Sequence, residues 1–534
     1  RRNFLKGSAA MGILAAMGGA GTAIAEGSSA YTFADTVKWD AEYDVVVLGL
    51  GFAGMTAAVT AADAGAKVLI AEKMSEALAG GNSKVAGQLF AYGHKDREAT
   101  MAYYTQLAGG RAVPEAMLNV IVDGVTNMWD KLKDKFFDGD DSEFMDWTGV
   151  PVIGEMSPEY PEFEGSDKVA LCTTHQGVSD SFLYKSVKNA VIKRADKIDV
   201  WFESPAVELI QDPDSRIVVG VKVTRNGETR NVRALGGVVV ATGGFECDTD
   251  MAQQYLGLKN YSVIGGQFNT GDGIKMAMDV GAIGDNMGPM MINGAFMPAE
   301  GEAICNGANK EVRALFRQGL LYVDSTGSRF FNEELTIDWP QASNAIARTG
   351  EWTYIVLDEA TKREFSTEGK GYPNPCGNFI QRHQAATQLD ALLKANEAKG
   401  NVFIGNTIEE VAKKAGMDPA TLKASADMMT KFAKQGRDDQ FGKDKYYLRA
   451  VSEGPFYVVR GKLNTLTSLN GVKVNADLQV LDKNDHVIQG LYAIGHDAGG
   501  VYGDSYDLKV GEGTASAFAI NSGRMAVRKI LADK

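Results

Sequence analysis

The sequence predicts an α/β protein built on a parallel sheet, because a buried strand, a glycine-rich turn and a helix follow one another near its start. Asp44–Leu48 is an apolar, β-branched run, as expected of a strand buried in a parallel sheet. Gly49, Gly51 and Gly54 then form a GxGxxG spacing, and an Ala-rich helix follows from Met55. The first glycine permits a tight turn, the second lets the backbone approach a pyrophosphate, and the third lets the helix pack on the strand.

A second strand and an acid follow at the spacing that a dinucleotide-binding unit requires. Lys67–Ala71 is mostly apolar and leads into Glu72, 23 residues after Gly49. At about this distance an acid can bind the ribose hydroxyls of a dinucleotide. A GxGxxG alone is a weak signal, because it also fits an ordinary glycine-rich turn. The complete order of strand, turn, helix, strand and acid favours a Rossmann-like dinucleotide-binding domain.

Two later segments return the chain to this domain. Val238–Phe245 (VVVATGGF) has the pattern of a buried strand that runs into a Gly-Gly turn, and Gly490–Gly500 has a similar pattern before a small-residue helix. We therefore expect the first part of the dinucleotide-binding domain over residues 41–294, an α+β capping domain for the substrate over 295–460, and the second part of the first domain over 461–534.

Inside the expected capping domain, two helix starts are marked by their first residues. Thr407 precedes Glu410 in a capping box, and Asp418 precedes Pro419, which suits the first position of a helix. Apolar residues at helical spacing after Pro419 indicate a helix packed on a core, not a cofactor site.

The segment Gly80–Gln88 (GGNSKVAGQ) resembles the loop along the flavin in the fumarate reductase and succinate dehydrogenase flavoprotein superfamily. Asn269–Ala282 and Gly327–Glu333 match the same superfamily in the same order, so the resemblance covers roughly residues 41–530. It implies FAD as the cofactor. In the quinone-linked members a histidine of this loop carries the flavin covalently, and Asn82 stands at the matching position. We therefore expect non-covalent FAD.

The resemblance also implies which residues contact FAD. His496 stands where the family has Glu or Asn beside the flavin. Besides Gly49, Gly51, Gly54 and Glu72, the expected contacts are Lys73, Gly81, Asn82, Ser83, Gly87, Gln88, Val207, Thr242, Gly243, Asp272, His496, Asp497, Gly513 and Ser516.

The chain departs from the fumarate and urocanate reductases at the positions that hold and protonate the substrate. Those reductases place an acid-acting arginine four residues after the Asn-Glu of the GSRFFNE-like motif, where this chain has Ile337. 3-Ketosteroid dehydrogenases place a tyrosine there. The reductases' substrate-clamping arginine matches Tyr506, and two of their histidines match Tyr502 and Thr467. A dicarboxylate would lack its cationic partners here, so fumarate is not the expected substrate.

The remaining residues suggest how a larger, less charged substrate is handled. Tyr502 and Tyr506 are candidate proton donors or hydrogen-bond donors, and Arg317 resembles an arginine of the reductases' proton-delivery route. Each also fits a purely structural role. Three side chains are expected to line an apolar pocket: Phe296, Met297 and Trp339.

The expected function is that of an FAD-dependent reductase that transfers hydride from flavin N5 to a carbonyl-conjugated C=C bond of an aromatic or ring-bearing substrate. A 3-ketosteroid-dehydrogenase-like ring desaturase is the first alternative, because tyrosines replace the arginine. A third hypothesis is an exported flavoprotein that only carries electrons. A large capping domain argues against it, since a pure carrier has no need to exclude water from its flavin.

The N-terminal residues have the pattern of an export signal. A basic start, RRNFLKG, precedes a short Gly/Ala-rich apolar stretch that closes with Ala23-Ile24-Ala25. Arg1-Arg2 suggests the twin-arginine route, which exports folded proteins. We expect residues 1–25 to be the signal and 26–40 a tether, with the protein periplasmic or on the cell surface. The alternative is a basic tail that happens to precede apolar residues.

Charge and cysteine spacing limit the partners. The formal net charge of −13 disfavours nucleic acid and anionic membranes. The four cysteines form no CxxC or CxxCH, so a c-type haem or iron–sulfur motif is excluded. Electrons must therefore pass through a separate cytochrome or flavoprotein, and the protein meets the membrane only through that donor. No metal site is expected.

Overall fold

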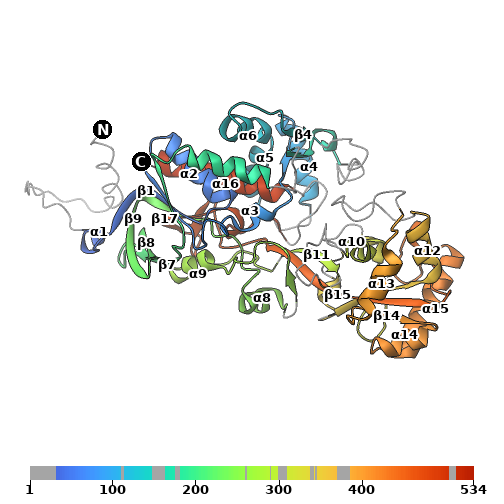
Figure 1. Cartoon of the computed structure of the whole chain (residues 1–534). Helices are drawn as coiled ribbons and strands as arrows, with labels where there is room; N and C mark the ends of the chain where they lie inside the picture. The colour runs from blue at the N-terminus through green and yellow to red at the C-terminus, as the bar shows by residue number, and fades with distance from the viewer. Residues whose placement is uncertain are drawn as a thin grey trace, which may run out of the picture.

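The computed structural model describes residues 32–109, 113–146, 163–174, 181–258, 261–288, 290–296, 298, 309–336, 342, 345–350, 352–369, 385–503 and 513–533. Figure 1 shows two parts, one built around β1 and β9 and the other around β14 and helices α12 to α15, with the long strand β15 running between them.

The first part is built on an eight-stranded sheet among the described residues, in which β16-β17-β9-β1-β2-β6 lie side by side and β8, paired with β7, also pairs with β9. Val47 lies between Ile70 and Val239, and the four central pairings are parallel. The predicted Rossmann-like α/β fold is confirmed. The strands are β1 (Ala41–Leu48), β2 (Val68–Ala71), β6 (Ile198–Trp201), β7 (Ala206–Gln211), β8 (Val218–Arg225), β9 (Glu228–Val240), β16 (Gln479–Leu481) and β17 (Val487–Ala493).

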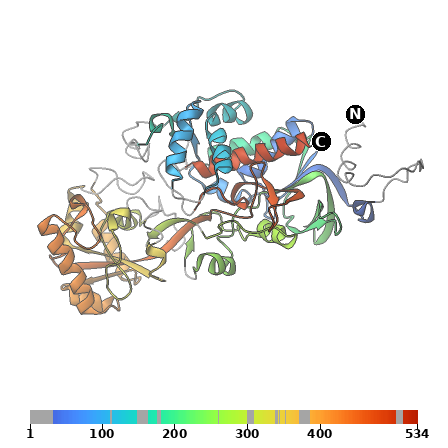
Figure 2. The same cartoon turned by 180° about the vertical axis from the view of Figure 1, so that it is seen from behind.

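Helices α2 (Phe52–Asp63) and α16 (Thr514–Ala532) pack together on one face of this sheet, as Figures 1 and 2 show. Their contact is close, because a Cβ on Gly523 would lie 2.3 Å from the Ala53 carbonyl oxygen. The other helices of this part are α1 (Phe33–Thr36), α3 (Gly81–Val85), α4 (Arg97–Leu107), α5 (Glu115–Val125), α6 (Met128–Phe136), α7 (Phe182–Ile192), α8 (Thr249–Leu256) and α9 (Asp272–Asp279).

A small antiparallel sheet, in the order β3-β5-β4, lies within the first part. Its strands are β3 (Leu89–Tyr92), β4 (Phe144–Asp146) and β5 (Ala170–Thr174). Phe90 of β3 packs edge-on against Phe144 of β4 with ring centroids 5.5 Å apart, and both rings join the core that also contains α2 and α16 residues. This sheet therefore extends the core on the α2 face.

The capping part contains a second sheet, of six strands among the described residues: β10 (Ser262–Val263), β11 (Met290–Phe296), β12 (Leu321–Val323), β13 (Trp352–Asp358), β14 (Val402–Gly405) and β15 (Phe456–Ser468). Its helices are α10 (Lys310–Ala314), α12 (Glu359–Thr367), α13 (Leu389–Glu397), α14 (Ile408–Lys414) and α15 (Pro419–Gln435). Both predicted helix starts are confirmed, since the Glu410 N–H donates to Thr407 Oγ1 and the Thr421 N–H donates to Asp418 Oδ2.

A two-stranded connection joins the parts. β11 runs antiparallel to β15, with Met290 opposite Ser468 and Phe296 opposite Lys462. The expected domain limits at 294 and 460 fall inside these two strands, so the exact division stays a prediction. β15 therefore begins in the capping sheet at Phe456, opposite Asp358, and ends at Ser468, whose N–H donates to Glu246 of the first part.

None of the helices in the described ranges is both long and apolar enough to cross a membrane.

Candidate FAD and substrate site

The turn between β1 and α2 is built by close backbone approaches. Gly49 has φ +106°, and a Cβ there would lie 2.3 Å from the carbonyl oxygen of Ala241 at the end of β9. A Cβ on Gly54 would lie 2.1 Å from the Gly49 carbonyl oxygen. Only glycine fits these contacts. The N-cap of the twelve-residue helix α2 is Gly51, which places no side chain over the helix N-terminus, the end of a helix that binds phosphates.

Glu72 is held beside this turn. It follows β2, and its two carboxylate oxygens accept hydrogen bonds from the Leu50 N–H at 3.0 Å and the Met74 N–H at 2.9 Å. Burial raises the pKa of Glu72, and these backbone donors oppose that rise. Each oxygen keeps acceptor capacity, as binding of ribose hydroxyls would require.

The loop that contains α3 is tied to the same turn. Ser83 Oγ accepts from the Phe52 N–H, the first residue of α2, at 2.9 Å. The Gln88 side chain is fully buried and is used within the fold, because its Nε2 donates to the carbonyls of Ser83 and Ala86 and its Oε1 accepts from the Tyr184 N–H. Gln88 therefore shapes the loop, while Gly81 and Gly87 lie in or directly beside α3.

The ends of β9 and β17 bring Thr242, Gly243 and Asp497 together. Thr242 Oγ1 donates to Asp497 Oδ1 at 2.9 Å, and the Gly243 N–H donates to Oδ2 at 2.8 Å. Asp497 lies in the 3₁₀ helix η6 (Gly495–Asp497) and is fully buried; burial raises its pKa to about 7. Ligands of parallel α/β sheets bind at these carboxyl ends of the strands.

Lys73 and Asp272 also meet. Lys73 Nζ lies 2.7 Å from Asp272 Oδ2 and 2.8 Å from Thr270 Oγ1, and both charged side chains are partly exposed. Three other predicted positions, Val207, Gly513 and Ser516, lie elsewhere in the first part. The β7–β8 register shifts between Ala206 and Glu208, as at a β-bulge, so Val207 has no partner residue in this register, and Val207 is 50% exposed. Gly513, with φ +82°, is the N-cap of α16, and Ser516 lies in the first turn of that helix.

His496 pairs with Thr467, the last residue but one of β15. Its Nδ1 lies 2.8 Å from Thr467 Oγ1, and its Nε2 is buried without a hydrogen-bond partner among the described residues. Burial lowers the pKa of His496 to about 4, so the imidazole is neutral at neutral pH. The buried Tyr502 ring packs edge-on against it, with centroids 6.1 Å apart.

Glu246 is a further candidate site residue, which no motif in the sequence singled out. This fully buried side chain accepts from Asn82 Nδ2 at 2.8 Å and from Asn269 Nδ2 at 2.6 Å, and its Oε2 accepts from the Ser468 N–H at 3.1 Å. Its place directly after the VVVATGGF strand and turn was the available signal, because an acid there follows the end of a parallel strand.

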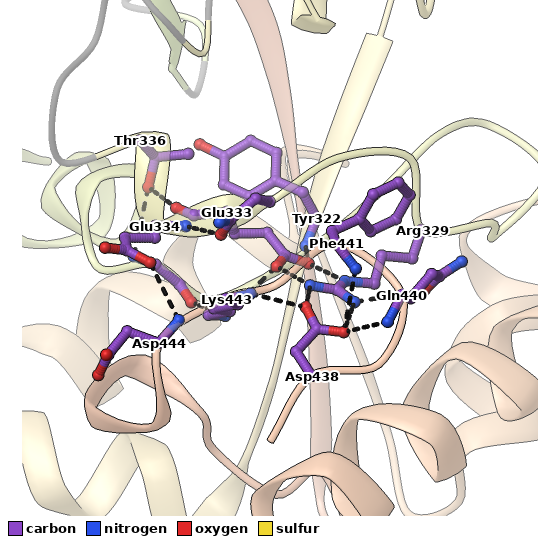
Figure 3. A network of polar contacts seen from close by, with 12 residues as sticks. Tyr322, Arg329, Glu333, Glu334, Thr336, Asp438, Gln440, Phe441, Lys443 and Asp444 are labelled. Atoms are coloured by element: carbon purple, nitrogen blue, oxygen red, sulfur yellow. Dashed lines mark hydrogen bonds and ion pairs between the residues drawn. The ribbon is translucent and has the colours of Figure 1, made fainter. Parts of the chain in front are cut away.

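The motif Gly327–Glu333 is anchored in the capping part by a buried charge cluster (Figure 3). Arg329 donates to both oxygens of Glu333, at 2.8 and 2.7 Å, and to both oxygens of Asp438, at 3.0 and 2.7 Å. Lys443 Nζ lies 3.4 Å from Glu333 Oε2. Burial raises the pKa of Asp438, but the Arg329 and backbone bonds outweigh burial and hold it well below its usual range.

Several expected residues lie outside the described ranges: residues 1–31, Cys305, Cys376, Met297, Ile337, Trp339, Tyr506 and the side chain of Phe296. Of the candidate proton donors, Tyr502 belongs to the first part, and Arg317 lies buried in the 3₁₀ helix η3 (Leu315–Arg317) of the capping part. Cys172 and Cys247 are free cysteines. The described residues hold no group of side chains suited to a metal ion.

These features fit FAD. The turn at Gly49 and Gly54 is a cradle that a Cβ would fill, Glu72 stands beside it with acceptor capacity, and His496 Nε2 is an orphaned polar atom at the end of β17. The model of the FAD binding domain family matches residues 44–509. The chain belongs to this FAD-binding family. FAD as the cofactor and an FAD-dependent oxidoreductase as the class of protein are therefore confirmed.

Known proteins support the same assignment. The vinyl phenol reductase of Lactiplantibacillus plantarum is 28% identical over 499 residues, which cover 91% of this chain and 96% of the relative. A cytochrome-type fumarate reductase of Shewanella frigidimarina is 26% identical over 487 residues, 90% of this chain and 76% of the relative. The structure of 3-ketosteroid Δ1-dehydrogenase from Sterolibacterium denitrificans has a TM-score of 0.71 at 22% identity, over 92% of this chain and all of that one. The resemblance to the fumarate reductase superfamily is confirmed.

Proposed function

We propose that this oxidoreductase reduces a C=C bond of a ring-bearing substrate that is not a dicarboxylate, with the alkene conjugated to a carbonyl group or an aromatic ring. The observation that carries the proposal is the neutral group of Thr467, His496 and Tyr502. Positions 467 and 502 match substrate-site histidines of the reductases, and burial lowers the pKa of the neighbouring His496 to about 4, which favours an uncharged imidazole at neutral pH. Such a group suits a hydroxyl or carbonyl, not paired carboxylates.

The named relative supports an aromatic substrate. Vinyl phenol reductase matches nearly its whole length to this chain, and its name specifies an alkene attached to a phenol ring. A phenol presents a flat apolar ring and one polar group, which matches a site made of Tyr502 and a neutral histidine.

FAD and the residues of the site have separate proposed roles. Bound FAD supplies the hydride at N5. Tyr502, Tyr506 and Arg317 are the proposed proton donors to the neighbouring carbon. Asn82 donates to Glu246 and accepts from the Gly266 N–H, which supports FAD held without a covalent bond at this position. The remaining expected FAD contacts are proposed in the same roles as in the family.

The deciding experiment is anoxic stopped-flow of the dithionite-reduced, FAD-loaded protein. Fumarate, urocanate, 4-vinylphenol, hydroxycinnamates, a stilbene and an enone steroid are each mixed with it, and reoxidation is followed at the flavin absorbance. Rapid reoxidation by an aromatic alkene or a ring enone, with fumarate inactive, is the expected result. Rapid reoxidation by fumarate would overturn the proposal.

A ketosteroid-dehydrogenase-like desaturase is the second candidate, favoured by the buried Tyr502 phenol beside His496. It predicts that the oxidised protein is bleached by a saturated ring ketone. Export by the twin-arginine route and electron supply by a separate cytochrome or flavoprotein also belong to the proposal. Fusion of residues 1–40 to a folded reporter, with and without the two arginines, tests the export route.

A further inference from the structure

Glu246 lies where four segments of the FAD-binding part meet. Its side chain is 0% exposed. Oε1 accepts from the side-chain amides of Asn82 and Asn269, at 2.8 and 2.6 Å. Oε2 accepts from the Ser468 N–H at 3.1 Å and faces the Ser468 hydroxyl at 3.4 Å. One carboxyl group therefore joins the α3 loop, the approach to α9 and the end of β15 to the turn after β9.

The backbone is adapted to this meeting. A Cβ on Gly244 would lie 2.5 Å from Glu246 Oε2 and 2.1 Å from Ser468 Oγ. Any side chain at position 244 would therefore displace the carboxyl group or the hydroxyl. The second glycine of the VVVATGGF turn has a role beyond turn geometry, because it leaves room for Glu246.

All four groups that face the carboxyl are donors. The Gly266 N–H donates to Asn82 Oδ1 at 2.5 Å, which directs the Asn82 amide N–H₂ toward Glu246. The Phe245 N–H donates to Ser468 Oγ at 2.8 Å, which leaves the Ser468 hydroxyl proton for Glu246. A neutral acid would present its own O–H to these donors, whereas a carboxylate can accept all four bonds.

No lysine or arginine forms an ion pair with Glu246 among the residues that the structure describes. Burial raises its pKa, and the bonds from the Asn269 and Asn82 amides and from backbone N–H groups, that of Ser468 among them, oppose that rise. The neighbouring titratable groups are Cys247 and Tyr261, whose hydroxyl donates to the Glu246 carbonyl oxygen; burial raises their pKa values to about 11 and about 12. Both therefore remain neutral around Glu246 at neutral pH.

We infer that Glu246 is an ionised carboxylate that acts as a positioning residue for FAD. It fixes Asn82 in the loop that faces the flavin, and it fixes the Thr467–Ser468 end of β15, next to His496. Since β15 continues into the capping sheet, the same carboxylate ties the FAD loop to the strand that carries the substrate-covering part. This inference requires FAD binding alone and does not depend on the proposed substrate.

The test is Glu246→Gln, which keeps the side chain's shape but places an N–H₂ against donors. FAD titrated into the apoprotein, followed by flavin fluorescence, is expected to bind roughly ten- to hundred-fold more weakly, because charge-assisted bonds are lost. The visible absorbance bands of the bound flavin should also shift. Glu397→Gln, at the exposed C-terminal end of α13, is the matched control and should leave both unchanged.

The pH dependence separates a charge from a merely structural contact. In the wild-type protein FAD affinity should fall on acidification as Glu246 takes up a proton, and Glu246→Gln should lack that step. Glu246→Asp keeps the charge, so it should bind FAD more weakly yet still lose affinity on acidification. If Glu246→Gln does not fold, the pH profile of Glu246→Asp is the test of the inference. Wild-type affinity and an unchanged pH profile in Glu246→Gln, or loss of the step in Glu246→Asp, would overturn the inference.

Discussion

The hydroxyl of Thr467 determines which nitrogen of His496 carries the proton. Thr467 Oγ1 donates to the Ser468 carbonyl oxygen at 2.9 Å and lies 2.8 Å from His496 Nδ1. Because its single proton is already used, this oxygen accepts from an Nδ1–H. The buried Nε2 therefore carries a lone pair and is available as a hydrogen-bond acceptor.

This assignment predicts a pH effect on stability. The unfolded chain protonates the imidazole below about pH 6.5, whereas the folded protein does so only near pH 4, where burial places the pKa of His496. The unfolded state thus binds more protons in this window, and the apoprotein should lose about 2 kcal/mol of unfolding free energy at pH 5 relative to pH 8. His496→Asn should lack this loss in urea unfolding measured across that range.

The pH dependence must be compared between variants, because Asp497 contributes a pH dependence of the opposite sign. Its pKa is raised to about 7 in the folded protein, so its contribution to the unfolding free energy decreases as pH rises. His486→Asn, whose side chain is 77% exposed, is the control and should follow the wild type. An equal pH dependence in His496→Asn and wild type would show that His496 is not a buried neutral imidazole.

Gly54→Val should abolish FAD binding. Its Cβ would lie 2.1 Å from the Gly49 carbonyl oxygen, so α2 must move away from the phosphate-binding turn, at a cost of at least about 1–3 kcal/mol. The ratio of flavin to protein absorbance in the purified variant measures the effect. Gly288→Ala serves as control, because its Cβ meets only the Tyr255 carbonyl oxygen at 3.7 Å. Full FAD occupancy in Gly54→Val would contradict the close approach of Gly54 to the Gly49 carbonyl oxygen in the phosphate-binding turn.

Arg329→Leu should destabilise the protein by about 3–5 kcal/mol, because Glu333 and Asp438 would remain buried without their cation. Guanidinium chloride unfolding measures this. Arg363→Leu breaks an exposed ion pair with Glu453 and should cost only about 0–1 kcal/mol. The depressed pKa of Asp438 makes the cluster's contribution complete at neutral pH and smaller only as pH falls below about 4. Similar losses in both variants would contradict the arrangement in Figure 3.

Tyr502→Phe tests proton donation. If the phenol supplies the proton, alkene reduction should fall roughly 10²–10⁴-fold while FAD binding and flavin reduction by dithionite remain. Tyr506→Phe and Arg317→Lys are compared in the same single-turnover assay. The variant with the large loss identifies the donor, and a wild-type rate in all three would remove them from the chemistry.

Local patterns in the sequence predicted much of the fold. The strand at Asp44–Leu48, the glycine turn and Glu72 are set by residues close in sequence, and the helix starts at Thr407 and Asp418 depend on a side chain that caps its own helix. Such short-range rules require no knowledge of distant segments. The connection through β11 and β15 was not foreseen, because strand pairing across more than 160 residues leaves no local pattern.

The sequence by itself determined the dinucleotide-binding turn, the identity of FAD through the resemblance, and the loss of charged groups at positions 467 and 502. Only the tertiary structure shows that His496 lies within hydrogen-bonding distance of Thr467. It also shows that the Glu246 carboxyl group accepts hydrogen bonds from three other segments, at Asn82, Asn269 and Ser468. These contacts join residues up to 222 positions apart. Whether a buried side chain is charged, and what it holds in place, depends on the donors and burial that such segments provide when they fold together.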